Sequence, residues 1–520
     1  MSNQAKLNID KKIFLLVFTI AFILFIFTNS GHRYTSDEDV GQKLAKSIVT
    51  QEPSTPSLYV PGKTRPGYDV PGDNTGLPIC RGPILCSEAF IGHGLVEVPF
   101  IFINHNFHII TQNTLVLTNS DFRDPNYIFW RNSLDPDDTF MQLFFGPVFS
   151  ALSVGTFFLT SRLFGYHLKT SVILAFFFAT ATLVWAYSKT SFNLVPESFF
   201  LLLGVYLFIR YLKRNSLKSL VFSAISIGFA LLVREDAVLI GSIVSVFLIA
   251  SVLRQRNRVK RLALFFVPAI FFIFLDRLID YIRFMPGTNE PGYVGGSWIP
   301  THFLWLLIYG VPGILLSPGV GIFVFYPILA TCFLSFTDFY GKHKLECIMF
   351  LSFAATYLLF YGSMSNWHGM NAWAARYVMA IIPFLLLPLG ATIEKRKNKI
   401  LGVLLVGLCG LGVLSNVVYV IQDENWFVYG MWGYKTGLIA LGGGGLDWHP
   451  AVMYTFEYSQ LTWSIITALT NLQPDIYLLF VFGPVLYSGL FAAIIPLAYI
   501  LTRLIRLEQI CLTKELPKGF

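Results

Sequence analysis

Long apolar runs separated by short charged loops are the feature that most constrains what this chain can fold into. About twelve of these runs approach the length needed to cross roughly 30 Å of hydrocarbon. Only 13% of the 520 residues are charged, against about a quarter in soluble domains. A membrane β-barrel would instead show short segments that alternate between apolar and polar residues. The sequence therefore predicts an all-α polytopic membrane protein. The runs lie at 13–28, 141–163, 170–186, 197–212, 217–233, 237–253, 262–282, 320–337, 347–363, 376–393, 400–421 and 477–502.

The distribution of charge predicts how the chain is oriented. If the N-terminus is cytoplasmic and the spans alternate, the cytoplasmic segments receive most of the 38 Lys and Arg residues. The other side receives most of the 30 Asp and Glu residues. Short cytoplasmic loops are rich in Lys and Arg in membrane proteins, so both termini are expected in the cytoplasm, most simply under a prokaryotic plasma membrane. The net charge of +8 is thus a sign of topology, and it is not evidence for nucleic-acid binding.

Two large segments are expected on the extracytoplasmic side. The first loop, 29–140, is rich in Pro and Gly at 53–83 and becomes apolar and aromatic at 88–118. The apolar part predicts one or two helices lying in the membrane interface, with Glu97 and His93 among apolar neighbours. The second large loop, 422–476, is rich in Trp, Tyr and Gly.

The chain is expected to divide into two transmembrane modules. Residues 1–284 would form an N-terminal catalytic module that includes the first loop, and 285–520 a C-terminal module that includes 422–476. The apolar stretch 303–319 is interrupted by Gly and Pro at several positions. We interpret that stretch as a re-entrant or broken helix at the surface.

Ionisable residues gather at the outer ends of the predicted spans. Asp37, Glu38 and Asp39 follow the first span directly. Ionisable residues at such positions are costly and are often functional. Carboxylates combined with Lys and Arg suit a reaction that needs a general base and a neutralised phosphate leaving group. The further candidates on the same side are Lys189, Glu197, Arg234, His368 and Arg376.

At this point the sequence resembles a family. The acids after the first span resemble the first-loop carboxylate motif of the GT-C membrane glycosyltransferases, in particular the polyprenyl-phosphate-sugar-dependent group. That group includes the protein mannosyltransferases and the lipid A aminoarabinose transferases. The resemblance consists of scattered short motifs over roughly 13–393. The further motifs are Ala186-Tyr187-Ser188-Lys189-Thr190 with Pro196-Glu197, Leu316-Ser317-Pro318-Gly319-Val320-Gly321-Ile322-Phe323, and Ala375-Arg376-Tyr377 with Pro383.

The resemblance implies a glycosyltransferase with a lipid-linked sugar donor and an acceptor hydroxyl on a protein, lipid or glycan. Asp37 or Glu38 would take the proton of the acceptor, and Lys189 and Arg376 would hold the lipid phosphate. The Ser-Pro-Gly motif often continues with Arg in such proteins, whereas Val320 stands here. We therefore assign no phosphate contact to that motif. The remaining residues assigned to substrate binding are Glu197, Arg234 and His368.

Some alternatives stay open at this stage. The resemblance implies no metal cofactor, yet Asp37-x-Asp39 has the form of a motif that related enzymes use for a divalent metal, and carboxylates suit Mg²⁺ or Mn²⁺. Lys189 would also fit a lysine reaching from a span towards the surface. Glu197 after a proline would fit a simple helix start. The alternative function is a transporter or flippase of a lipid-linked saccharide, although charged residues in mid-membrane would be expected of it.

Overall fold

The protein is helical throughout the part of the chain that the computed structural model describes. That part comprises residues 3–34, 36–52, 85, 87, 89–111, 135–284, 303–364, 367–369, 372–396, 398–422, 453–457, 459–470, 472 and 474–514. The regular elements in these ranges are all helices, which confirms the predicted all-α fold. They are α1 (Asn3–Phe27), α2 (Ser36–Thr50), α3 (Ile91–Phe107), α5 (Pro136–Leu163), α6 (Leu168–Thr180), α7 (Leu183–Tyr187), α8 (Leu194–Arg214), α9 (Leu217–Val233), α10 (Ala237–Val252), α11 (Arg258–Arg283), α12 (Phe303–Leu316), α13 (Ile322–Phe325), η4 (Pro327–Thr331), α14 (Cys332–Tyr340), α15 (Lys344–Gly362), η5 (Arg376–Ile381), α16 (Ile382–Leu386), α17 (Leu389–Lys395), α18 (Lys399–Val420), α21 (Gln460–Thr470), α22 (Tyr477–Phe491) and α23 (Ile494–Lys514).

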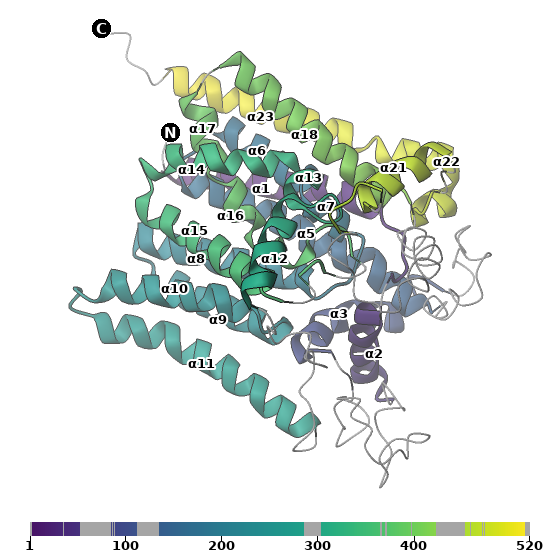
Figure 1. Cartoon of the computed structure of the whole chain (residues 1–520), viewed down its shortest axis with the longest axis horizontal. Coiled ribbons are helices and arrows are strands. Elements are labelled where there is room, and N and C mark those ends of the chain that lie inside the picture. Colours follow the sequence, from purple (N-terminus) through teal and green to yellow (C-terminus); the bar gives the residue numbers. More distant parts are fainter. Residues whose placement is uncertain are drawn as a thin grey trace.

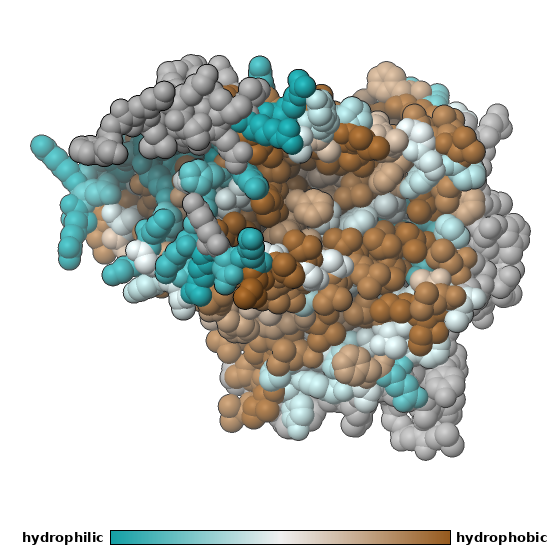
Figure 2. Space-filling view, turned by 90° about the horizontal axis from the view of Figure 1, so that it is seen from above, coloured by the Kyte–Doolittle hydropathy of each residue, from teal (hydrophilic) through white to brown (hydrophobic). Residues whose placement is uncertain are grey.

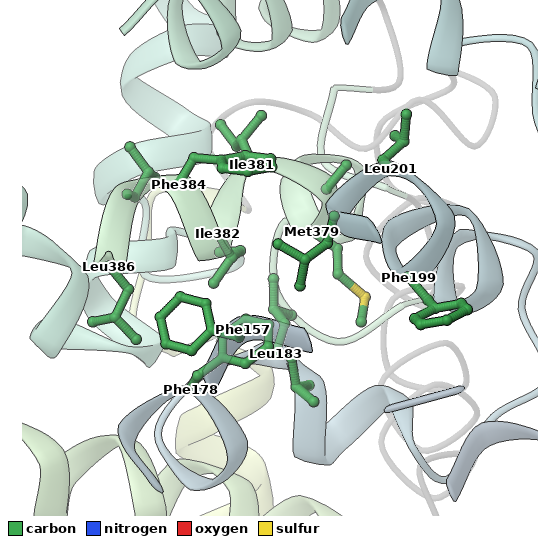
Figure 3. Packing of buried hydrophobic residues seen from close by; sticks show 14 of the residues in the cluster. Phe157, Phe178, Leu183, Phe199, Leu201, Met379, Ile381, Ile382, Phe384 and Leu386 are labelled. Atoms are coloured by element: carbon green, nitrogen blue, oxygen red, sulfur yellow. The ribbon is translucent and has the colours of Figure 1, made fainter. Parts of the chain in front are cut away.

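The helices form a bundle with α5 and α8 near its centre (Figure 1). Helix α8 packs against α5, α9 and η5, and α1 packs along α5. One continuous cluster of buried apolar side chains joins the N-terminal helices to the later ones. In Figure 3, Phe157 and Phe178 from the N-terminal half lie beside Ile382 and Leu386 from the C-terminal half. The two expected modules therefore share one core, and their division at 284/285 stays a proposal.

Broad apolar surfaces on the outside of the bundle identify an integral multi-pass membrane protein. Among the described residues, seven helical segments are long and apolar enough to cross a membrane, and shorter apolar helices accompany them. No residue is buried in the apolar window of the stretch Tyr477–Arg506, and Val403 on α18 is 74% exposed. Figure 2 shows the resulting hydrophobic face, with hydrophilic residues gathered at its left end. The total of about twelve spans stays a prediction.

Local sequence explains where several helices begin. Asp135 caps α5 by accepting the backbone N–H of Asp137, and Pro136 occupies the first helical position, where its missing N–H costs nothing. Ser216 caps α9 in the same way. Asn215 ends α8 in the left-handed conformation, with φ 52°, which asparagine adopts more readily than most residues.

Two sequence-based interpretations are corrected by the structure. The stretch 303–319 was expected to be a re-entrant or broken helix: Phe303–Leu316 is one unbroken helix with Pro312 inside it, and its re-entrant placement stays a prediction. It packs closely on α15, because Gly310 lies against the backbone of Gly362. The run 320–337, in contrast, is divided among α13, η4 and α14, with Pro327 starting the second of these.

The first loop contains a helix that the sequence analysis did not expect. Helix α2 begins at Ser36 and packs against α3, the helix predicted within 88–118. A Cβ atom on Gly41 of α2 would lie 2.5 Å from the ring of His93, and one on Gly94 of α3 would lie 2.7 Å from Leu44. The two glycines therefore allow the helices to approach closely. The segments 53–83 and 112–134, and most of 422–476, lie outside the described residues.

A buried ion cluster ties together the two ends of the chain. Arg162 at the end of α5 donates to Asp10 of α1 at 2.9 Å and to Glu508 of α23 at 2.8 Å. Both termini consequently lie at the same end of the molecule, while α2 and α3 lie at the opposite end (Figure 1). This arrangement fits termini on one side of the membrane.

Candidate functional site

Three consecutive residues between α7 and α8 bring the main sequence-predicted site residues together. They are residues 191–193, at the end of the turn that contains the Tyr-Ser-Lys motif. Adjacent Cα atoms are 3.8 Å apart, so the backbone of this segment spans less than about 8 Å. A first-loop carboxylate and two arginines thereby share one region. The contacts are Ser191 N–H to Glu38 Oε1 at 2.8 Å, the Phe192 ring to the Arg376 guanidinium at 4.7 Å, and Arg234 Nη1 to Asn193 Oδ1 at 3.4 Å.

Glu38 lies in the first turn of α2 and is fully buried. Its Oε2 accepts the backbone N–H of Tyr34 at 2.7 Å, while Oε1 accepts that of Ser191. Hydrogen bonds from backbone N–H groups to a carboxylate are strong and directional. Glu38 therefore has no exposed surface, and it holds α2 against the core.

The other two acids of this motif differ from Glu38. Asp37 belongs to the same helical turn, and its side chain lies outside the described residues. Asp39 forms ion pairs with Arg33 and with Lys43. The oxygens of Asp39 are thus already engaged by two cations.

Arg234 lies at the junction of α9 and α10 and has two acidic partners. Its Nε donates to Asp236 at 2.7 Å, and the same nitrogen lies 3.7 Å from Glu197 Oε2. Its Nη2 donates to the Tyr361 hydroxyl at 3.1 Å, and that hydroxyl in turn donates to Asp236. Tyr357 donates to Glu197 at 3.4 Å. The cluster therefore contains two of the expected site residues, Arg234 and Glu197, and adds Asp236, which directly follows the Arg-Glu pair in the sequence.

Tyr377 connects Arg234 with Arg376. The guanidinium carbon of each arginine lies 5.3 Å from the centre of this ring, within the range of cation–π attraction. Tyr377 also stacks on Tyr361, with 4.8 Å between ring centres and an angle of 8°. One aromatic ring thus fixes the spacing of two cations. Tyr377 belongs to the motif Ala375-Arg376-Tyr377, but nothing in that motif predicts its contact with Arg234.

Lys189 has contacts that do not support its expected phosphate-binding role. The side chain is buried, and its ammonium donates to the carbonyls of Val420 at 3.0 Å and Gln422 at 2.7 Å. It also pairs with Asp475 at 3.1 Å. An ammonium has three donors, and these three partners take all of them. We therefore interpret Lys189 as a positioning residue.

Asp475 completes this second cluster. It accepts the hydroxyl of Tyr34 at 2.7 Å and contacts His32 Nε2 at 2.8 Å. Because the backbone of Tyr34 also donates to Glu38, the pair of Lys189 and Asp475 supports the turn before α2. Asp475 is not among the site residues predicted from the sequence. The signal was an acidic residue directly before the last apolar run.

His368 is buried between α15 and η5, beside Trp367, with 5.6 Å between their rings. The next residue, Gly369, packs against the aliphatic part of Arg376, because a Cβ there would lie 3.1 Å from its Cγ. The residue that follows His368 in the sequence therefore contacts the Arg376 side chain. Its predicted contact with substrate stays untested.

A further buried polar group lies on the other side of Ser191. His93 Nε2 contacts the carbonyl of Ser191 at 2.8 Å and Glu97 Oε1 at 3.2 Å. Burial raises the pKa of Glu97 to about 7, although His93 acts in the opposite direction. Gln142 donates to the Ser191 hydroxyl at 2.8 Å. The spacing of His93 and Glu97, four residues apart on a helix, was the only signal of this pair in the sequence.

One cluster of three carboxylates in the described part of the chain has a spacing that could hold a metal ion. It consists of Glu235, Asp276 and Asp280, the last two of which were left outside the predicted site. Arg277 lies among them, 2.6 Å from Asp276 and 3.7 Å from Asp280, and it also pairs with Glu235. A guanidinium therefore offsets part of this negative charge, and we interpret the cluster as a structural ion network.

Residues 137–279 match the model of the dolichyl-phosphate-mannose-protein mannosyltransferase family. No curated protein matches the chain significantly. Among solved structures, the chain is similar to the crystal structure of ArnT from Cupriavidus metallidurans in the apo state, with a TM-score of 0.46 and 12% sequence identity. That alignment covers 93% of this chain and 77% of the ArnT chain. The matched family segment contains residues 191–193, Glu197 and Arg234, and its match confirms the resemblance of this protein to the GT-C membrane glycosyltransferases.

Proposed function

We propose that the protein transfers a sugar from a polyprenyl-phosphate donor to an acceptor hydroxyl on the extracytoplasmic face of the membrane. The observation that carries this proposal is the contact of residues 191–193 with a first-loop carboxylate residue and two arginines. These contacts bring the first turn of α2, which carries Asp37 and Glu38, to the same short segment as Arg376, and a carboxylate and a cation in one region suit the two ends of a glycosyl phosphate. The family match over 137–279, which includes this segment, supports the same class of donor.

The chemistry that suits this arrangement is a direct displacement at the anomeric carbon. The acceptor oxygen forms a bond to that carbon, and the bond from the carbon to the phosphate oxygen breaks. The electron pair leaves with the lipid phosphate, and the acceptor proton passes to a carboxylate. Arg376 would neutralise the leaving phosphate. Arg234 is already paired with Asp236 and Glu197, so we assign it to holding Tyr377 and the second arginine.

The carboxylate most suited to accept the proton is Asp37. Both oxygens of the neighbouring Glu38 already accept backbone N–H groups, and that side chain is fully buried. Such bonds weaken a carboxylate as a base, because they stabilise its ionised form. We therefore propose Asp37 as the general base and Glu38 as the residue that holds the first turn of α2 in place.

We propose that the reaction requires no metal ion. A metal bound by Asp37 and Asp39 would compete with Arg33 and Lys43 for the carboxylate of Asp39.

The proposal allows either a hexose or a pentose as the transferred sugar. We place the catalytic module at 1–284, with 285–520 as the second module and its segment 422–476 contributing to acceptor choice. We also propose a prokaryotic plasma membrane with both termini cytoplasmic.

The first experiment measures consumption of radiolabelled polyprenyl-phosphate sugars by the purified protein in lipid nanodiscs. Asp37→Asn should lower kcat by roughly 10²- to 10⁴-fold with an unchanged Tm, because it removes only the base. Glu38→Gln should lower both kcat and Tm, because an amide leaves one buried backbone N–H facing another N–H group. EDTA should change neither variant nor wild type.

Asp39→Asn is the matched control, since it changes an acid in the same turn that is paired elsewhere. It should retain wild-type turnover. Loss of turnover in this variant together with sensitivity to EDTA would instead establish a metal site at Asp37-x-Asp39. If no donor is consumed while lipid-linked saccharide crosses the bilayer, the transferase proposal fails and a flippase is the better description.

A further inference from the structure

The Ser191 peptide is held from both sides. Its N–H donates to Glu38 of α2, and its carbonyl contacts His93 Nε2 of α3 at 2.8 Å. A carbonyl oxygen cannot donate, so His93 must carry a proton on Nε2 to make this hydrogen bond. The peptide at the start of the segment 191–193 is thereby fixed between two helices of the first loop.

Close packing fixes the imidazole of His93. A Cβ atom added to Gly41 of α2 would lie 2.5 Å from Cε1 and 2.7 Å from Nδ1 of the ring. The ring therefore lies directly against the backbone of α2. Helix α3 is itself held at its start, because Gly92 lies against the backbone of Leu232 at the end of α9. The position of the ring is thus fixed by packing, and the strength of its hydrogen bond to Ser191 depends on the other acceptor that the same N–H meets.

Glu97 competes for the same proton. Its Oε1 lies 3.2 Å from His93 Nε2, and neither carboxylate oxygen has a hydrogen-bond partner at ordinary geometry. The side chain is fully buried. The other charged groups that act on it are Glu38 from α2 and Asp138 from α5, both acidic, while α9 presents Leu232 and Val233 to the start of α3. An ionised Glu97 would therefore be repelled by the carboxylates of Glu38 and Asp138 and would have the N–H of His93 as a hydrogen-bond donor.

The charge of Glu97 decides how the N–H of His93 is shared. Burial raises the pKa of Glu97 to about 7, so the carboxyl is neutral below that pH and ionised above it. A neutral carboxyl leaves the N–H to the carbonyl of Ser191. An ionised carboxylate is the stronger acceptor and draws the N–H towards itself.

We propose that His93 and Glu97 are positioning residues for the transfer reaction: they hold the Ser191 peptide in place while Glu97 is protonated and release it when Glu97 ionises. The consequence is an alkaline limb in the turnover, with activity falling as the pH rises through about 7. The sign agrees with linkage, since a carboxyl with a raised pKa in the folded state stabilises that state below its unfolded pKa and loses this effect as the pH rises. This inference rests on the proposed transferase function.

Two variants at His93 test the hydrogen bond separately from packing. His93→Gln retains an N–H donor, whereas His93→Leu retains only the bulk. Measured as donor turnover against pH in nanodiscs, His93→Leu should lose roughly tenfold or more in kcat, and His93→Gln should recover most of it. His105→Gln is the matched control on the same helix, since His105 pairs with Asp137 and is expected to leave the profile unchanged.

Glu97→Gln tests the origin of the pH dependence. The amide does not ionise, so the alkaline limb should disappear or move by more than one pH unit. An unshifted limb in Glu97→Gln, or equal loss of turnover in the Leu and Gln variants at His93, overturns the proposal.

Hydrogen–deuterium exchange keeps this inference distinguishable from the proposed function. After correction for intrinsic exchange, peptides covering 188–193 should exchange faster above about pH 7 in wild type and at all pH values in His93→Leu. They should be independent of pH in Glu97→Gln. This result needs no donor, so it holds or fails even if no sugar is transferred. A wild-type pH dependence that persists in Glu97→Gln contradicts the positioning role.

Discussion

At the scale of single residues, the site depends on which partners already engage each charged group. Arg234 has two carboxylates beside it, whereas the contacts of Arg376 described above are with the rings of Phe192 and Tyr377. Lys189 uses its three donors on Val420, Gln422 and Asp475. A sequence shows the charge of a residue, but it does not show which partner that charge is paired with.

Tyr377 provides a test at this scale. Tyr377→Leu removes the ring that both guanidinium groups contact, while Tyr377→Phe keeps it. Two cation–π contacts amount to about 1–2 kcal/mol at exposed sites and to more at buried sites such as this one. We expect kcat/KM for the donor to fall roughly tenfold in the Leu variant and to stay within about twofold of wild type in the Phe variant. Equal values for both variants would show that the ring does not order the arginines.

Individual helices could be predicted from the sequence where contact with lipid requires an apolar sequence. The runs at 217–233 and 400–421 correspond to α9 and α18 almost residue for residue, because a helix that crosses hydrocarbon must be apolar over its whole length. Helix α2 was missed since it is short and mixed in polarity. The residues of the site could be named, but their convergence on 191–193 depends on packing between distant helices, which spacing alone does not reveal.

The close approach of α2 and α3 gives a prediction for whole elements. In Gly41→Ala the new Cβ would overlap the His93 ring, so one helix must move. We expect a lower Tm and at least a tenfold loss of turnover, in spite of the better helix propensity of alanine. Gly402→Ala in α18, where nothing lies within 4 Å of the new atom, is the control and should be neutral or stabilising. A neutral Gly41→Ala would mean that the two helices separate without consequence.

At the scale of the whole molecule, the N-terminal and C-terminal helices meet at Arg162. Its side chain is only 6% exposed and has carboxylates from both ends of the chain as partners. Removing one member of a buried ion cluster typically costs about 3–5 kcal/mol, because the other charges are left buried.

Arg162→Gln should therefore lower the thermal midpoint of the protein in nanodiscs by several degrees and loosen α23 from the bundle. Limited proteolysis near the C-terminus reports the second effect. Arg214→Gln changes an exposed arginine near the end of α8 and should alter neither measurement. If Arg162→Gln matched that control, the two ends of the chain would be held by apolar packing alone.

The spacing of the site along residues 191–193 has a consequence for behaviour on heating. Ser191, Phe192 and Asn193 are joined by covalent bonds, so the three contact points on this segment keep a fixed spacing, and a helix that drifts away with temperature loses its contact with the segment. Thermal inactivation should then be abrupt and coincide with the unfolding of the bundle. An enzyme whose catalytic groups are spaced only by packing would lose activity gradually, over a range of temperatures below its melting point.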